Sequence, residues 1–315
     1  MTASSARFAA RVRVRLGPDR LRPGVPLAPF TTFHVGGAAE WLADIQTVDE
    51  LRDVLVAASD ANIPVSLLGG GSNVLVADAG VPGLVLRLRL GAIDRPADDV
   101  VRAEAGGTIN GLVRWTIGRG IAGLEAWAGT PGTVGGAICG NAHWDRRNIG
   151  DLVRRVLVTS LAGDLREVPQ ADMGFAYDTS RLQRTGEILI WAEFGVSPGA
   201  VPALREQARA SLHYRKRTQP LSMPSAGCVF RNPDPAVDRL PDGVPASAGA
   251  LVDRAGLKGH RVGGARISET HANFIINDGG ATAADVRALI EAARAAVVDR
   301  FGVQLRDEIV YLGTF

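Results

Sequence analysis

Two glycine-rich segments could bind a ligand through the backbone itself. The first runs Leu67-Leu-Gly-Gly-Gly-Ser-Asn-Val-Leu75, and the second runs Ala128-Gly-Thr-Pro-Gly-Thr-Val-Gly-Gly-Ala-Ile-Cys-Gly-Asn-Ala142. Small side chains let backbone N–H groups approach a diphosphate without the help of a lysine. Either segment alone fits a set of tight turns equally well. Together, with Ser72 and Asn73 available as donors, they favour a nucleotide cofactor of a kind that these residues do not specify.

A second signal combines a cationic run with a thiol. Tyr214-Arg-Lys-Arg-Thr-Gln-Pro220 precedes Pro224-Ser-Ala-Gly-Cys-Val-Phe-Arg-Asn-Pro233, which contains Cys228. The basic run suits an anionic ligand, and a thiol with an ordinary pKa near ~8.5 is mostly protonated at pH 7, so it can donate a proton. The competing interpretation is a buried cysteine in a strand beside a solvated helix end. Near the C-terminus, the alternating pattern around Glu308 is typical of an exposed strand face, and nothing local makes this residue catalytic.

Several common catalytic motifs are absent from the chain. There is no GxxxxGK[ST] phosphate loop, no strand–GxGxxG–helix fingerprint, no HExxH and no GxSxG. The five histidines lack the spacing of metal ligands, so we expect them to be structural or surface residues and expect no metal site.

Composition excludes further classes of function. The 315 residues carry a net charge of +2, which gives no electrostatic argument for nucleic-acid binding, and only two of the 35 basic residues are lysines, Lys216 and Lys258. Two cysteines 89 positions apart form no disulfide framework, which favours a reducing, cytoplasmic compartment. The longest uncharged run, Ala126–Trp144, is broken by glycines and a proline, so we expect no membrane span.

Hydrophobic periodicity and helix-capping signals predict an α+β chain in three sections, residues 1–90, 91–205 and 206–315. The first section should have β-α-β-β order, with a capping box at Thr47–Glu50. The predicted helices are 47–61, 108–119, 201–214, 247–255 and one that begins at Thr282, whose apolar face is Val286, Leu289, Ile290, Ala293 and Val297. The predicted strands are 65–68, 74–77, 84–90, 153–160, 165–168, 187–196, 227–231, 272–277 and 304–312.

Six ordered motifs resemble those of one known family. They are Thr32-Phe-His-Val-Gly-Gly37, Leu68-Gly-Gly-Gly-Ser-Asn-Val-Leu75, Gly129-Thr-Pro-Gly-Thr-Val-Gly-Gly136, Pro224-Ser-Ala-Gly227, Ala255-Gly-Leu-Lys-Gly259 and Ile267-Ser-Glu-Thr-His-Ala-Asn-Phe-Ile-Ile276. The chain resembles the UDP-N-acetylenolpyruvoylglucosamine reductase (MurB) family from about Phe30 to Leu312. The short interval between Ser180 and Glu187 is similar to that of the type II members.

The resemblance implies a flavoenzyme of peptidoglycan synthesis and cell-wall biogenesis. NADPH would reduce FAD, which would then reduce the enolpyruvyl group of a UDP-sugar to give UDP-N-acetylmuramate. The implied fold is a two-part FAD-binding domain of the vanillyl-alcohol-oxidase/PCMH type, residues 1–90 and 91–205, plus a C-terminal α+β substrate domain, 206–315, whose last strand returns to the FAD domain. The implied partner is the UDP-sugar, with no nucleic acid and no membrane, in a cytoplasmic monomer or weak oligomer.

The resemblance also assigns roles to individual residues. Cys228 occupies the place of the family serine that donates the proton, and Glu308 matches the C-terminal glutamate that polarises the substrate. The implied cofactor-binding residues are Gly69, Gly70, Gly71, Ser72, Asn73, Gly129, Thr130, Pro131, Gly132, Gly135, Gly136, Ala137, Asn141 and Arg215. The implied substrate-binding residues are Tyr177, Gln219, Asn232 and Lys258, of which Lys258 should tolerate arginine poorly.

One departure from the family pattern bears directly on catalysis. The family has Tyr-Arg-x-Ser where this chain has Tyr177-Asp-Thr-Ser180, so Asp178 stands at the position of an arginine that stabilises developing negative charge. We hypothesise that Arg181 or a shifted loop restores the positive charge. Two alternatives remain open: a non-catalytic or altered relative that binds FAD or a UDP-sugar, which Asp178 favours, and another flavin oxidoreductase of the PCMH type.

Overall fold

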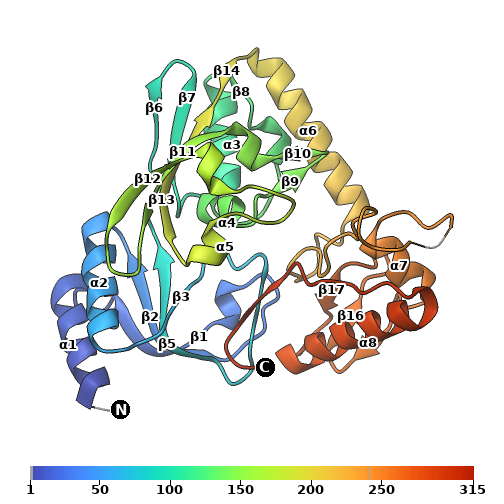
Figure 1. Ribbon diagram of the computed structural model, residues 1–315, viewed down its shortest axis with the longest axis horizontal. Coiled ribbons are helices and arrows are strands. Elements are labelled where there is room, and N and C mark those ends of the chain that lie inside the picture. The colour runs from blue at the N-terminus through green and yellow to red at the C-terminus, as the bar shows by residue number, and fades with distance from the viewer. Residues whose placement is uncertain (1–2, 241) are drawn as a thin grey trace. The chain divides into compact units, whose positions relative to one another are not determined.

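The computed structural model describes residues 3–240 and 242–315, which form two compact units. The first unit contains the described residues up to Val25 together with Glu40–Gly70 and Pro82–Tyr214. The second contains Pro26–Ala39, Gly71–Val81 and Arg215–Phe315. Each unit is thus assembled from segments that are far apart in the sequence and mixes helices with strands, which confirms the predicted α+β class (Figure 1).

The N-terminal part of the first unit packs two helices beside a sheet. Helices α1 (Ala3–Leu16) and α2 (Val48–Asp60) share an apolar core with strands in the order β1 (Leu21–Pro26), β2 (Ala38–Ile45), β5 (Val81–Leu88), β3 (Val65–Leu67). Thr47 accepts the Glu50 N–H over 3.1 Å, as predicted, but the Glu50 carboxylate accepts from Gln46 and Arg20 rather than closing a capping box. The predicted β-α-β-β order therefore has one helix and two strands fewer than the observed order, α1-β1-β2-α2-β3-β4-β5, in which β4 is Val74–Val76.

The second part of the first unit is built on a five-stranded antiparallel sheet (Figure 1). Its order is β12 (Leu165–Pro169), β11 (Val153–Thr159), β13 (Ile188–Gly195), β7 (Val100–Glu104), β6 (Ile93–Ala97). Helices α3 (Ile109–Gly118) and α4 (Val134–Cys139) contribute to its core. The smaller elements are β8 (Ile121–Ala122), β9 (His143–Trp144), β10 (Arg147–Asn148), α5 (Leu182–Thr185) and β14 (Ser197–Pro198).

The second unit has its core under α7 (Ala248–Arg254) and α8 (Ala283–Phe301). It holds a small sheet, β15 (Arg261–Val262), β16 (Ala265–Ile267), β17 (Ile275–Asn277), and a parallel pair formed by β4 (Val74–Val76) and β18 (Val310–Leu312). The capping box at Thr282 and the five-residue apolar face of α8 are confirmed, since all five side chains are buried.

Three predicted elements differ from the observed ones. The predicted strand 227–231 is only a pair of isolated bridges, because Gly227 has a φ of +79° that a regular strand does not allow. The closing strand is confined to β18. Helix α6 (Val201–Thr218) continues past residue 214, since Arg215-Lys-Arg are good helix formers and stabilise the C-terminal end of the helix dipole.

Among the helices that the structure describes, none combines the length with the apolar character needed to span a bilayer.

Candidate functional site

The two glycine-rich segments approach each other within the first unit. A Cβ atom built on Gly70 would lie 2.7 Å from the Cα of Gly132, and one built on Gly69 would lie 2.8 Å from the Thr133 hydroxyl oxygen. Gly129 and Gly132 also have φ values of +82° and +100°, where side chains are strained. The loops that were predicted to act together are therefore adjacent, and only glycine permits the approach.

The second glycine-rich loop is held by neighbouring backbone and by one asparagine. Asn110, the second residue of α3, accepts the Gly129 N–H over 2.7 Å and donates to the Thr130 carbonyl over 3.1 Å. The Gly135 N–H donates to the Ala105 carbonyl over 2.8 Å. Sequence reasoning missed Asn110, because a helical asparagine 19 positions before Gly129 carries no local signal of this contact.

The other predicted cofactor residues of this unit follow the same loop into α4. Pro131 and Gly136 are exposed, Thr130 and Gly135 are half-buried, and Ala137 is buried. Thr133 caps α4 by accepting the Gly136 N–H over 3.2 Å. Asn141 is buried, and its side-chain amide forms hydrogen bonds within the protein: it donates to the Ala176 carbonyl and accepts the Gly150 N–H.

These loops fit the diphosphate of a dinucleotide cofactor. The approach at Gly70 and Gly132 leaves bare backbone where any side chain would collide. The donor set is neutral, as expected for a site that binds a diphosphate through main-chain amides.

The remaining residues of the first glycine segment belong to the second unit. Gly71 has a φ of +63°, and a Cβ there would collide with the Phe30 carbonyl oxygen. The Thr32 N–H donates to the Gly71 carbonyl over 3.0 Å. Beyond half-buried Ser72, the Asn73 side chain donates to the Glu308 carbonyl over 3.1 Å.

Cys228 and Glu308 are brought to the same part of the second unit. The backbone of Cys228 forms an isolated β-bridge with that of Phe274. The carbonyl of the next residue, Val229, accepts the Glu308 N–H over 2.8 Å. Asn73 thus holds Glu308 in place, and the backbone of Glu308 pairs with Val229, the residue that follows Cys228. Three segments that are far apart in the sequence, those of Asn73, Cys228 and Glu308, converge here.

A buried cation adjoins the Cys228 thiol. Arg215 is buried at the end of α6, and this burial lowers its pKa to about 10, an effect that the nearby Cys228 partly opposes. Arg215 therefore stays charged at neutral pH. Arg215 thus interacts electrostatically with Cys228, whereas the pKa of the other cysteine, Cys139, is raised by burial.

Asn273 fixes the segment that carries Cys228. The buried Asn273 side chain accepts the Phe230 N–H over 2.9 Å and donates to the Phe230 carbonyl over 2.7 Å, and its own carbonyl accepts the Val229 N–H. Asn273 lies inside one of the six family-like motifs, but its spacing from Cys228 did not reveal this positioning role.

The predicted substrate residues of the second unit are spread over three elements. Gln219 follows α6 and donates its N–H to the Arg215 carbonyl. Asn232 is exposed, and its side chain accepts the Ala248 N–H at the start of α7. Lys258 is exposed and forms an ion pair with Asp253 over 2.7 Å.

Asp178 lies in the first unit and pairs with a histidine. Its Oδ1 is 3.0 Å from His143 Nδ1, and the His143 ring lies 5.0 Å from the ring of the exposed Tyr177. Histidines were expected to be structural or surface residues, and nothing in the sequence linked positions 143 and 178.

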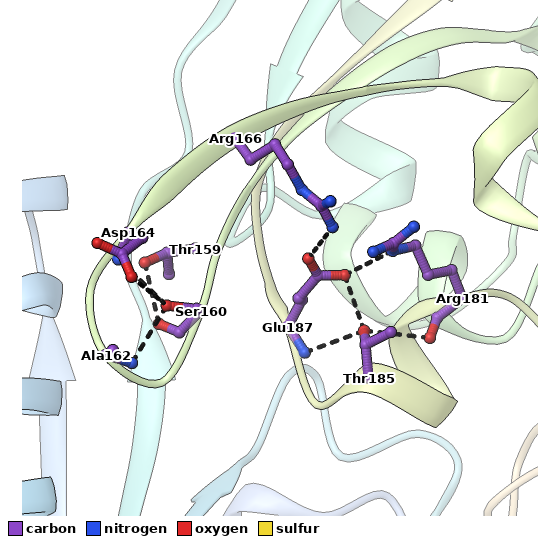
Figure 2. Close-up of polar contacts among 8 residues, drawn as sticks. All are labelled: Thr159, Ser160, Ala162, Asp164, Arg166, Arg181, Thr185 and Glu187. Atoms are coloured by element: carbon purple, nitrogen blue, oxygen red, sulfur yellow. Dashed lines mark hydrogen bonds and ion pairs between the residues drawn. The ribbon is translucent and has the colours of Figure 1, made fainter.

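Arg181 has a different partner from the one hypothesised. Figure 2 shows Glu187 between Arg181 and Arg166, with ion-pair distances of 2.7 and 2.5 Å. Thr185 also donates to the Glu187 carboxylate over 2.8 Å. Because the Arg181 guanidinium is committed to a carboxylate, this geometry does not favour Arg181 as the cation that replaces the missing arginine.

Comparisons with known proteins agree on one family. Residues 219–312 match the model of the C-terminal domain of UDP-N-acetylenolpyruvoylglucosamine reductase, and residues 40–168 match that of an FAD binding domain. The reductase of Synechococcus sp. (strain WH7803) is 39% identical over 299 residues, which is 93% of either chain. That of Gloeobacter violaceus is 38% identical over 297 residues, 94% of this chain and 97% of the relative. The solved reductase from Thermus caldophilus is 33% identical with a TM-score of 0.78, covering 93% of this chain and 99% of that one.

Proposed function

The chain belongs to the UDP-N-acetylenolpyruvoylglucosamine reductase family, and from this premise we propose how its residues carry out that reaction. It is an FAD-dependent, NADPH-linked oxidoreductase that reduces the enolpyruvyl group of UDP-N-acetylglucosamine enolpyruvate to UDP-N-acetylmuramate in peptidoglycan synthesis. The observation in the fold that carries this function is the meeting of Gly70 with Gly132, which leaves bare backbone for the FAD diphosphate.

The glycine-rich loops of the first unit bind the cofactor. The two loops that meet at Gly70 and Gly132 offer their bare backbone to the diphosphate, while Asn110 keeps the second loop in position. These loops would hold FAD, which would supply the hydride chemistry that links NADPH to the double bond of the substrate. The protein must therefore orient the substrate, stabilise the charge that develops on it, and supply one proton.

Cys228 supplies the proton. Its thiol replaces a serine hydroxyl and is the more acidic donor by several pKa units, so proton transfer to carbon remains feasible. Arg215 stabilises the thiolate that this transfer leaves behind, because the buried guanidinium keeps its charge at neutral pH. Solvent then returns the proton to the sulfur before the next turnover.

Glu308 polarises the substrate beside Cys228. Its backbone is fixed by two hydrogen bonds, one to the Val229 carbonyl and one from the Asn73 side chain. The point from which the carboxyl-bearing side chain extends is therefore fixed. Tyr177, Gln219, Asn232 and Lys258 bind the UDP-sugar, Lys258 as a compact point charge. The three-section division at residues 90 and 205, the monomeric or weakly oligomeric state and the cytoplasmic location complete this proposal.

A sequential flavin assay tests the function. The purified holoenzyme should show flavin absorbance near 450 nm that bleaches with NADPH under anaerobic conditions and returns when the UDP-enolpyruvyl sugar is added. Recovery only with oxygen would indicate a different flavin oxidoreductase, and failure of NADPH to bleach the flavin would indicate a non-catalytic relative.

A further inference from the structure

The strongest unexplained feature of the first unit is the burial of Asp178. Only 6% of this residue is exposed, yet its Oδ2 has no hydrogen-bond partner in the described part of the chain. Its Oδ1 lies 3.0 Å from His143 Nδ1. A buried carboxylate is costly unless it is paired with a cation, so the imidazole of His143 is the group that compensates Asp178.

The Asp178 turn is held rigidly toward His143. Asp178 has a φ of +52°, and the flanking Ala176 and Thr179 exchange backbone hydrogen bonds of 3.2 Å across it. The Asp178 carbonyl accepts from Gln183, and the Ala176 carbonyl accepts from buried Asn141. Four contacts around one turn fix the direction of the carboxylate, which is how a second residue is positioned for chemistry.

The pairing with Asp178 determines which ring nitrogen of His143 is left to interact with a ligand. An ionised carboxylate only accepts hydrogen bonds, so His143 Nδ1 carries the proton that Asp178 receives. The Nε2 atom is left as the second nitrogen, and in the imidazolium form it is an N–H donor bearing positive charge. The His143 side chain is 35% exposed, so it remains accessible to a ligand.

The other charged and titratable groups around His143 lie on neighbouring elements. The turn between β9 and β10 carries Asp145 and Arg146, both exposed, and β10 carries exposed Arg147, which faces Glu125 over 4.0 Å. Tyr177 adjoins the ring from the Asp178 turn, and Asp151 accepts from Asn148, the strand partner of His143. In the described part of the chain, Asp178 is the one carboxylate within ion-pair distance of His143.

We propose that His143, held by Asp178, replaces the family arginine as the donor to the negative charge that develops on the enolpyruvyl group. This inference rests on the proposed function, because position 178 is the position that the family uses for this purpose. The arginine contributes a full positive charge, whereas the His143–Asp178 pair is neutral overall and contributes one directed N–H. Asp178 is a positioning residue for this donor.

Anaerobic half-reactions separate this role from a structural one. In the His143→Ala holoenzyme, reoxidation of the reduced flavin by the UDP-enolpyruvyl sugar should slow by roughly 10²–10³, the usual loss for one oxyanion donor. Bleaching by NADPH and FAD content should stay unchanged. His213→Ala, which changes an exposed histidine on α6 of the same unit, is the matched control and should leave both steps intact.

Asp178→Asn supplies the second variant. The amide oxygen still accepts from His143 but the carboxylate charge is lost, so reoxidation should slow, though by less than in His143→Ala. Nitrogen-15 NMR of the five histidines should show His143 protonated at both ring nitrogens, because Nδ1–H faces Asp178 and Nε2–H is the donor.

Three results would overturn the inference: wild-type reoxidation in His143→Ala, equal slowing of both half-reactions, or a His143 protonated at only one of its two ring nitrogens. A wild-type enzyme that the UDP-sugar does not reoxidise would instead refute the proposed function.

Discussion

The backbone N–H of Glu308 donates to the carbonyl oxygen of Val229 over 2.8 Å, one residue after Cys228. A thiol and a carboxyl group that are 80 positions apart in the sequence are thereby built on paired backbone. This pairing explains how a residue with the unremarkable local pattern of Glu308 can belong to the site, since its neighbours on the chain do not reveal it.

A proton donor at position 228 should be essential for catalysis, but a hydroxyl should serve almost as well as the thiol. Cys228→Ala removes the proton donor and should slow substrate-dependent reoxidation of the flavin by about 10²–10⁴. Cys228→Ser keeps a donor and should retain most of the rate. Cys139→Ala is the matched control, because that cysteine is half-buried like Cys228 but lies in the first unit, and desolvation raises the pKa of its thiol. Stopped-flow absorbance checks all three, and a fast Cys228→Ala enzyme would contradict the assignment.

Adding one methyl group at Gly70 should impair FAD binding. The new Cβ would lie 2.7 Å from the Gly132 Cα, so the two loops must separate. We expect Gly70→Ala to be purified with much less bound flavin, measured by the 450 nm absorbance per polypeptide. Gly118→Ala, at an exposed helix position with open space around the Cβ, should bind normally and gain roughly 0.5–1 kcal/mol of stability. Equal flavin content in both variants would count against the diphosphate site.

The hydrogen bonds that Glu187 accepts from Arg181, Thr185 and Arg166 should make the free energy of unfolding decrease at acid pH. Burial alone raises the pKa of Glu187, but hydrogen bonds from Arg181, Thr185 and Arg166 outweigh it and hold the pKa below its ordinary value. The stabilisation is therefore complete above the unfolded carboxyl pKa near ~4.3 and is lost as pH falls through the lower folded value.

Glu187→Gln should lower the free energy of unfolding by about 1–3 kcal/mol at pH 7, and the difference from wild type should shrink below about pH 4. Urea unfolding at both pH values measures this. Glu269→Gln, which changes a carboxylate that is 73% exposed, should cost little at either pH. A difference that does not change with pH would show that Glu187 acts through packing alone.

Binding of the UDP-sugar should be sensitive to the shape of the cation at position 258. Lys258→Arg keeps the charge and can keep the ion pair to Asp253, but it replaces a point charge by a planar fork. We expect a higher KM for the UDP-sugar with a kcat close to wild type. An unchanged KM from steady-state kinetics would remove Lys258 from substrate binding.

Local signals in the sequence predicted the helices well. Thr47 and Thr282 cap their helices as expected, and the face from Val286 to Val297 is buried, because capping and a 3.6-residue period depend on neighbours within a few positions. The glycine loops were also predictable, since only glycine tolerates a backbone approach such as that at Gly70.

Long-range pairings were beyond prediction from the residues. Strands β6 and β7 have mixed burial patterns without a clear alternation, and Asn110, Asn273 and His143 act through partners many positions away. The Arg181 hypothesis depended on charge alone, whereas the observed partner, Glu187, is set by the fold at the start of β13. Residue type indicates what a side chain can do, but only tertiary structure selects its partner.

The parallel pairing of β4 with β18 has a consequence for synthesis of the protein. Asn73 and Glu308 are 235 positions apart, and the segments 26–39 and 71–81 belong to a unit whose remaining residues are translated last. At about 5–20 residues per second, the ribosome needs roughly 10–50 s to travel from the first strand of the pair to its partner. During that interval the two early segments can pair with each other, for example through Thr32 and Gly71, but β4 lacks its strand partner until β18 has been synthesised.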